Sequence, residues 1–210
     1  MTIKFYYFPL QARGEAIRMI LAHSKTEFED VRIQMGEWPK MKTENGDWFE
    51  FGQMPMLDMG NGMKMTQSKA IVRALGQKHG YYSSNPKEAW TIDSTMDYVS
   101  DNVEIFVKPA FADGEAKLAL LFELLTKQLP QFLSKIEKRV SGKKWIIGDR
   151  ITIADFMLGG LLTSTVANEG NPNYYAMAHI VKSYPGVCTY IENFKAEMKD
   201  YLASRPVSPF

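Results

Sequence analysis

The apolar residues of this 210-residue chain change their spacing near residue 80, and this change constrains the fold more than any other feature. Before it, short runs of β-branched and aromatic residues alternate with segments whose apolar residues recur every three or four positions, which is typical of strands alternating with helices. Strands are predicted over residues 3–8, 28–33, 54–59 and 63–66. The last two form a hairpin about a glycine-rich turn. Ser68 offers an N-cap to the helix that follows, which we expect to stop near Gly80.

The second part of the chain has only the helical spacing. Gly, Ser, Asn and Pro follow one another closely over residues 80–88 and predict a linker. Beyond the linker, Pro130 is expected to kink the second helix, and Thr152 with Asp155 has the spacing of a capping box at the start of an apolar helix. The sequence therefore predicts two domains. These are a small α/β domain over residues 1–79 and an all-helical domain over residues 89–210, joined by the linker.

Charge and cysteine content narrow the classes of function. The chain has 25 basic and 24 acidic residues, so no field of one sign covers the surface to attract nucleic acid or an anionic membrane. Cys188 is the only cysteine, which excludes an internal disulfide and favours a reducing compartment. No segment has the features of a secretory signal or a membrane span of ~20 apolar residues. The three histidines lack the spacing of metal ligands, so we expect no metal. The single cysteine and the lack of a signal or membrane span predict a cytoplasmic protein.

A strand that opens with Pro55 after a βαβ unit is the thioredoxin-like pattern, although the loop after the first strand lacks the Cys-x-x-Cys of dithiol exchange. Several short segments of the chain resemble, in order, the tyrosine-type cytosolic glutathione transferases of the mu, pi and sigma classes. They are YFPLQARGEAIR at 7–18, FGQMP at 51–55, QS at 67–68, MDYVSD at 96–101, WIIGDRITIAD at 145–155 and YLASRP at 201–206. The resemblance covers almost the whole chain. It implies an α/β thioredoxin-like N-terminal domain followed by an all-α C-terminal domain, with glutathione as co-substrate.

The same resemblance implies a catalytic tyrosine. A thiol with a pKa of ~8.5 is mostly protonated at neutral pH, so such an enzyme must favour the thiolate by hydrogen bonding and positive potential. Tyr7 ends the first strand just before a helix N-terminus, whose free N–H groups favour an anion. On composition alone Tyr7 is one more aromatic residue of an aromatic strand, and Arg13 is a solvated loop charge. The resemblance instead gives both residues a place beside the sulfur, with Tyr6 on the opposite side of the strand.

Glutathione has two carboxylates and one amino group, so its pocket needs hydrogen-bond donors at both ends and an acceptor near the γ-glutamyl nitrogen. The resemblance places the γ-glutamyl carboxylate at the start of the helix after the hairpin, where backbone N–H groups and a hydroxyl are available. It places the backbone of the residue before a cis proline against the cysteinyl part of the tripeptide. The implied glutathione-binding residues are Tyr7, Arg13, Trp38, Lys42, Gln53, Met54, Pro55, Gln67, Ser68 and Asp101 of the partner subunit. For Trp38 and Pro55, a packing role and an ordinary strand start remain the alternatives.

Three aspartates, Asp93, Asp97 and Asp101, lie four residues apart, and like charges at this spacing repel on one face of a helix. A solvated acidic face is the usual explanation. Lys69 and Arg73 form a basic pair with the same spacing, and a two-fold homodimer would let each row face its counterpart in the other subunit. The resemblance implies such a homodimer, and it implies that Phe51 is an aromatic key inserted into the neighbouring subunit. For Phe51, coverage of its own core is the alternative.

The resemblance also implies a pocket for a small hydrophobic electrophile, built from Phe8, Leu10, Met96 and Phe106, for all of which a core role is the alternative. The expected activity is conjugation of the glutathione thiolate to such electrophiles, as in xenobiotic detoxification. One alternative is a glutathione-dependent isomerase similar to the prostaglandin D synthases, although the sequence near Lys108 lacks the tryptophan expected in such a pocket. Another is a non-catalytic ligand-binding or crystallin-like relative.

Overall fold

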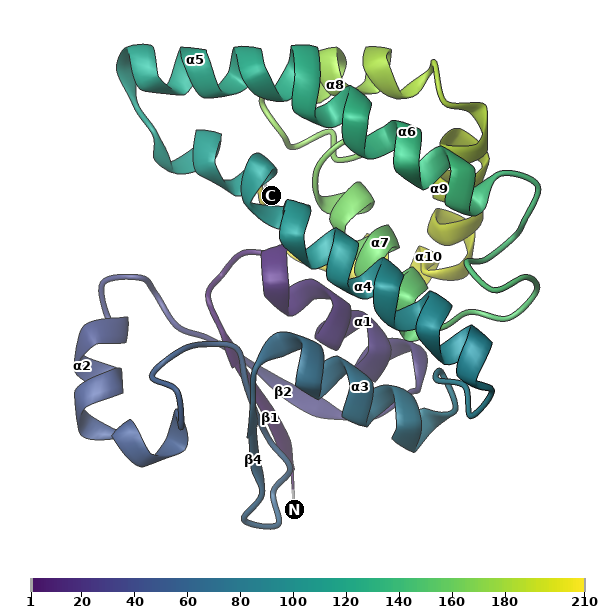
Figure 1. Ribbon diagram of the computed structural model, residues 1–210. Helices are drawn as coiled ribbons and strands as arrows, with labels where there is room; N and C mark the ends of the chain where they lie inside the picture. Colours follow the sequence, from purple (N-terminus) through teal and green to yellow (C-terminus); the bar gives the residue numbers. More distant parts are fainter. Residues whose placement is uncertain (1, 210) are drawn as a thin grey trace.

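The computed structural model describes residues 2–209, and its N-terminal part is built on a four-stranded mixed sheet (Figure 1). The strands are β1 (Ile3–Tyr7), β2 (Phe28–Arg32), β3 (Met56–Asp58) and β4 (Lys64–Thr66), in the spatial order β2-β1-β3-β4. β1 is parallel to β2 because the helix between them crosses over the sheet, whereas β3 is antiparallel to both β1 and β4. The order of strands and helices along the chain and the β3–β4 hairpin, both predicted from the sequence, are therefore confirmed.

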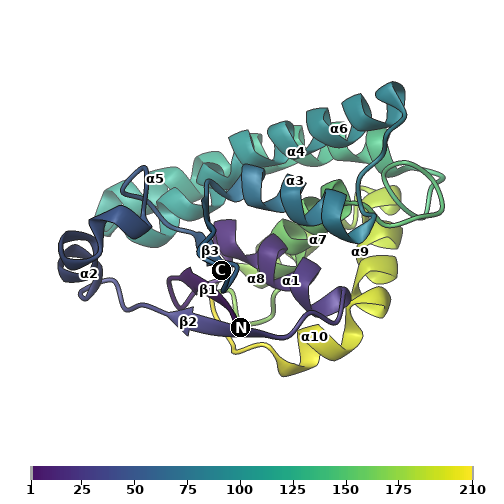
Figure 2. The same ribbon diagram turned by 90° about the horizontal axis from the view of Figure 1, so that it is seen from below.

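Helices cover the two faces of this sheet differently. α1 (Glu15–His23) and α3 (Ser68–His79) lie between the sheet and the second half of the chain, whereas α2 (Trp38–Glu44) lies apart from them (Figures 1 and 2). Side chains alternate along β1, so Phe5 and Tyr7 belong to the large core while Tyr6 belongs to a small second core that also includes side chains from α2. Tyr6 and Tyr7 thus face opposite sides, as predicted.

The second half of the chain is helical, as predicted, and it lies above the sheet domain in Figure 1. Its helices are α4 (Pro86–Val107), α5 (Gly114–Glu123), α6 (Leu129–Val140), α7 (Ile153–Ser164), α8 (Tyr174–Val181), α9 (Pro185–Glu197) and α10 (Lys199–Ser204). The Asn85 side chain caps α4 by accepting hydrogen bonds from the backbone of Lys87 and Glu88, so the last residues of the predicted linker are already helical. α5 and α6 are joined by a π-helical segment, Leu124–Gln128, which lies directly before the predicted kink at Pro130.

One hydrophobic core runs through both parts of the molecule. α7 lies at its centre and packs against both α1 and α4. The capping box predicted at the start of α7 is present, with the Thr152 and Asp155 side chains each bonded to the other's backbone. The chain then returns toward the sheet domain, where the Arg205 guanidinium lies 2.7 Å from a carboxylate oxygen of Glu15 on α1. Within residues 2–209, no helix combines the length and apolarity needed to cross a bilayer.

Candidate active site

Tyr7 ends β1, and its ring is held from two sides. The side chain is 5% exposed and packs against Phe5 and Phe8 with ring centroids 6.2 and 5.6 Å away. The backbone of Gly14, which directly precedes α1, closes the other side. A Cβ at Gly14 would lie 2.4 Å from Cδ1 of Tyr7, so the chain approaches the ring more closely than any residue with a side chain permits.

The Tyr7 hydroxyl is set up to donate a hydrogen bond. Burial raises the pKa of Tyr7, and this effect outweighs a hydrogen bond from the backbone of Arg13 and the charges of Arg13 and Arg18, which lower it. The hydroxyl therefore stays protonated at neutral pH. Because its oxygen accepts the Arg13 N–H, its own proton remains available for a nearby acceptor.

Arg13 contributes positive potential next to this hydroxyl. It lies in the 3₁₀ turn Ala12–Gly14, directly before the N-terminus of α1, where the helix dipole adds a further positive field. Its guanidinium is 3.8 Å from a carboxylate oxygen of Glu104 on α4, and its side chain is 40% exposed. This ion pair thus links the turn before α1 in the N-terminal domain to α4 in the helical domain, and the Arg13 charge stays partly exposed.

A second group of polar side chains gathers at the start of α3. Gln67 has a left-handed backbone conformation, with φ of 68°, and its Nε2 donates to Oε1 of Gln53 at 3.2 Å. α3 begins at Ser68 with Gln67 as its N-cap, and the Gln67 side chain makes no capping hydrogen bond to the free N–H groups there. The prediction that Ser68 caps this helix is therefore wrong by one residue. Its hydroxyl and the N–H groups of the first turn can instead receive an anion.

The remaining predicted glutathione contacts lie on α2 and in the segment that leads into β3. The Met54–Pro55 peptide bond is cis and directly precedes β3. Lys42 extends toward the same region. The Cε of its side chain lies so close to Gly52 that a Cβ added to Gly52 would be only 2.8 Å from it. Trp38 is half-buried and packs edge-to-face on Phe49 at a centroid distance of 4.9 Å. At least part of its role is therefore packing, which was the alternative to glutathione binding for this residue.

A largely apolar cavity of about 420 Å³ opens beside the Tyr7 ring. Its lining includes the predicted Phe8 and Leu10, but neither Met96 nor Phe106. Met96 is 0% exposed in the core, and Phe106 lines a separate cavity of about 260 Å³, because both belong to the face of α4 that points into the helical domain. The full lining is Tyr7, Phe8, Leu10, Ala12, Arg13, Met35, Val103, Glu104, Val107, Lys108 and Phe111.

Sequence reasoning missed the residues that α4 contributes to this cavity. Val103 and Val107 have the four-residue spacing of one helix face. Because the neighbouring Asp101 was already a candidate site residue, this spacing could have identified them as cavity residues. Met35 gave no such signal, because it lies in an irregular stretch between β2 and α2.

The aspartates of α4 are compensated within the chain. Lys69 and Arg73 on α3 lie 2.7 Å from Asp97 and Asp93, respectively, and the hydrogen bond from Lys69 lowers the pKa of Asp97. The charge compensation that the sequence analysis assigned to a second subunit is therefore made within one chain, where α3 and α4 lie side by side. Asp101 differs: it is exposed and forms no ion pair with any residue that the structure describes. Phe51 is also exposed, at 57%.

Comparison with known proteins gives a consistent result over the whole chain. Family models described as "Glutathione S-transferase, N-terminal domain" and "Glutathione S-transferase, C-terminal domain" match residues 1–76 and 100–205. The chain is 33% identical to the "Hematopoietic prostaglandin D synthase" of Mus musculus over 193 residues, covering 90% of this chain and 94% of that protein. It is 29% identical to the "Glutathione S-transferase P 1" of Xenopus laevis over 97% of this chain and 95% of that one.

A solved structure supports the same assignment. The structure titled "rat hPGDS complexed with a quinoline" superimposes with a TM-score of 0.85 and 26% sequence identity, covering 100% of both chains.

Proposed function

The chain belongs to the glutathione S-transferase family, and on that premise we propose that Tyr7 and Arg13 keep the sulfur of bound glutathione as a thiolate and direct it at small apolar electrophiles. Enzymes of this family use glutathione as a substrate. A thiol near its ordinary pKa of ~8.5 is a poor nucleophile at neutral pH because little of it is ionised. Preferential binding of the thiolate removes this barrier before the reaction starts.

The protonated, buried hydroxyl of Tyr7 carries this proposal. Since burial raises the pKa of Tyr7, the side chain acts as a hydrogen-bond donor to the sulfur and not as a base that removes its proton. Arg13 and the N-terminus of α1 add positive potential at the same point. The thiol proton leaves to solvent, and the thiolate remains.

We assign the rest of glutathione to the groove between the sheet and α4. In this assignment the γ-glutamyl carboxylate meets the first turn of α3, the backbone before Pro55 pairs with the cysteinyl unit, and the glycyl carboxylate lies near Lys42. The residues proposed to bind the tripeptide are Tyr7, Arg13, Trp38, Lys42, Gln53, Met54, Pro55, Gln67, Ser68 and Asp101 of the partner subunit. Exposed Asp101 and Phe51 support a homodimer in which each subunit completes the other's site.

The electrophile occupies the cavity of about 420 Å³ beside Tyr7 in this proposal. The cavity has mostly apolar walls from residues of both domains, so it suits small hydrophobic molecules and brings them next to the sulfur. Residues 1–79 then bind glutathione, residues 89–210 supply the α4 wall, and residues 80–88 connect them. Such an activity fits detoxification in the cytoplasm.

A pair of adjacent tyrosines provides the test. Tyr7→Phe is expected to lower kcat with a chlorodinitrobenzene-type electrophile about 10²-fold, because one preorganised donor to the developing charge is lost. Glutathione affinity should stay nearly unchanged, while the ultraviolet absorbance of bound thiolate should appear only at higher pH. Tyr6→Phe removes an equivalent hydroxyl on the opposite face of β1 and should leave both measurements unaltered. Unchanged turnover in Tyr7→Phe would refute the role of this hydroxyl.

Isomerisation is the second candidate, favoured by the similarity to the mouse prostaglandin D synthase. None of the cavity-lining residues within the described chain is a tryptophan, which was the aromatic wall expected for such an activity. Incubation with glutathione and a prostaglandin endoperoxide separates the two functions, since an isomerase consumes the endoperoxide without consuming glutathione.

A further inference from the structure

We propose that Arg18 is a positioning residue for this reaction, which holds the Phe8–Leu10 loop and the Tyr7 ring in the geometry that the site requires. This inference rests on the proposed function. It concerns a residue of α1 that does not line the cavity and touches neither the sulfur nor the electrophile in the assignment above.

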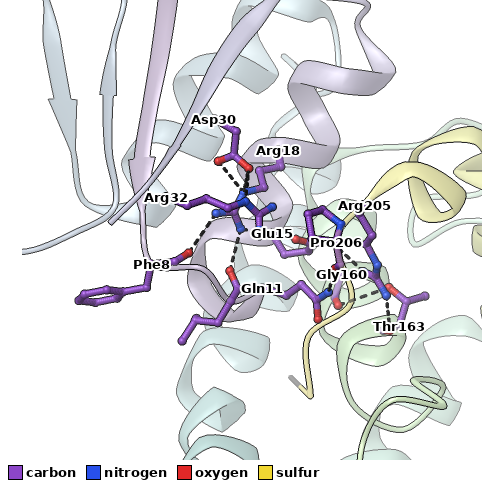
Figure 3. A network of polar contacts seen from close by, with 11 residues as sticks. Phe8, Gln11, Glu15, Arg18, Asp30, Arg32, Gly160, Thr163, Arg205 and Pro206 are labelled. Carbon is purple, nitrogen blue, oxygen red and sulfur yellow. Dashed lines mark hydrogen bonds and ion pairs between the residues drawn. The ribbon is translucent and has the colours of Figure 1, made fainter. Parts of the chain in front are cut away.

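The guanidinium of Arg18 bonds to the backbone of the loop that forms the cavity wall. Its Nη1 donates to the carbonyl of Leu10 at 2.8 Å. Its Nη2 donates to the carbonyl of Phe8 at 3.2 Å (Figure 3). These carbonyls flank Pro9, in a segment outside any helix or strand. The loop has no regular hydrogen-bond ladder of its own there, so its path depends on these two bonds.

The same guanidinium contacts the ring of Tyr7. Its Cζ lies 5.6 Å from the centroid of Tyr7 and 5.1 Å from that of Phe5, distances at which a cation is attracted to an aromatic face. One buried side chain therefore touches the catalytic ring and both carbonyls of the loop that follows it. A displacement of the guanidinium would move the phenol and the cavity wall together.

Two carboxylates keep the guanidinium in place. Its Nε lies 3.0 and 3.1 Å from the two oxygens of Asp30 on β2, and Nη1 lies 3.7 Å from an oxygen of Glu15. Glu15 in turn pairs with Arg205, which donates to the carbonyl of Thr163 on α7 at 2.7 Å (Figure 3). The Arg18 side chain is 1% exposed. It is thus clamped between β2 and the C-terminal segment, and its fork geometry is what lets one group serve all these partners.

Arg32 offers a matched control for a role in stability alone. It donates to the same Asp30 carboxylate at 2.7 Å and its side chain is 22% exposed. Its polar contacts within the described residues go to Asp30 and not to the loop. Loss of Arg32 therefore disturbs the ion-pair network but leaves the bonds to Phe8 and Leu10 intact.

The test compares Arg18→Met, Arg18→Lys and Arg32→Met by kcat and KM for each substrate, glutathione affinity, and unfolding in urea. Arg18→Met is expected to lower kcat/KM for the electrophile by roughly 10- to 100-fold, because small misplacements of reacting groups have effects of this size. Glutathione affinity should change by less than about two-fold, since none of the residues proposed to bind the tripeptide's two ends is altered. Arg32→Met should keep the wild-type kcat.

Arg18→Lys keeps the buried charge but cannot reach Asp30 and both carbonyls with one ammonium group. It is expected to show the same loss of kcat/KM for the electrophile, and it replaces Arg18→Met if that variant does not fold. Wild-type kcat/KM per folded molecule in Arg18→Lys, or an equal loss in Arg32→Met, would overturn the positioning role. If the wild-type protein itself conjugates no electrophile, the proposed function fails instead, so the two failures are distinguishable.

Discussion

The contact between Gly14 and Tyr7 gives a test at the scale of one residue. Gly14 has an ordinary right-handed conformation, with φ of −84° and ψ of −22°, so alanine fits the backbone there and only its methyl group conflicts with the ring. Since that methyl would lie 2.4 Å from Cδ1 of Tyr7, the ring must shift. We expect Gly14→Ala to reduce kcat by roughly 10- to 100-fold, as small displacements of catalytic groups do, measured as conjugation at saturating glutathione.

Gly46→Ala is the control for this substitution, because an added Cβ at Gly46 meets nothing within 4 Å. It should retain wild-type kcat. Urea unfolding of both variants separates a displaced ring from a general loss of folded protein. If Gly14→Ala were fully active, the close approach of the backbone would have no part in placing the phenol.

At the scale of an element, the start of α7 depends on one buried carboxylate. Asp155 accepts hydrogen bonds from the backbone of Ile146 and Thr152, from the Thr152 hydroxyl and from the Tyr190 hydroxyl. Burial nevertheless raises the pKa of Asp155 from 3.8 to about 6. The native state then binds the proton more tightly than the unfolded chain, so the stability contributed by this carboxyl is fully present below about pH 4 and decreases as pH rises toward 6.

We therefore predict that Asp155→Asn lowers the free energy of unfolding by roughly 2–4 kcal/mol, since the amide leaves buried donors unpaired. The difference from wild type should be larger at pH 4 than at pH 7, by about 3 kcal/mol at most. Urea midpoints measured across this range test the sign. Thr152→Val, which removes one donor but keeps the carboxyl, should preserve the pH dependence. A difference that grows with pH would mean that the four donors outweigh burial.

The elements themselves were largely predictable, whereas several contacts between them were not. Alternating and helical spacing are local properties, so they identified the strands, α1, α3 and the capping box of α7. The pairing of Asp93 and Asp97 with α3 depends on which helices are neighbours in the fold, which the spacing of residues along the chain does not give. The short connection between α3 and α4 makes them neighbours, and with that rule the compensation could have been assigned to one chain.

For the candidate site as well, some residues could be predicted from the sequence and some contacts could not. Tyr7 and Arg13 were predicted as site residues from an ordered set of short motifs that spans the chain, and the structure brings them together at the start of α1. Met96 was wrongly given to the cavity because helical spacing identifies a face but not the neighbour that this face meets. The bonds from Arg18 to the Phe8–Leu10 loop left no mark in the sequence, since carbonyl acceptors are present at every residue.

At the scale of the whole molecule, the proposed homodimer predicts that the Asp101 of each glutathione site comes from the partner subunit. Asp101 is exposed on α4 and forms no ion pair with the residues that the structure describes, so its charge is available to an ammonium group. If it serves the partner's glutathione, Asp101→Asn should weaken glutathione binding roughly 10-fold or more, through loss of a charge-assisted hydrogen bond. The loss should occur in the site whose Tyr7 belongs to the other chain.

Mixed dimers separate this arrangement from one in which Asp101 serves its own chain. A dimer of one Tyr7→Phe subunit and one Asp101→Asn subunit has one wild-type site if the aspartate acts across the interface, and none if it acts within its chain. Random exchange of subunits makes half of the dimers mixed, so about a quarter of wild-type activity should return at low glutathione concentration. Exchange of Tyr7→Phe subunits with subunits carrying both substitutions creates no intact site and should restore nothing. Recovery in neither mixture would place Asp101 in the site of its own subunit.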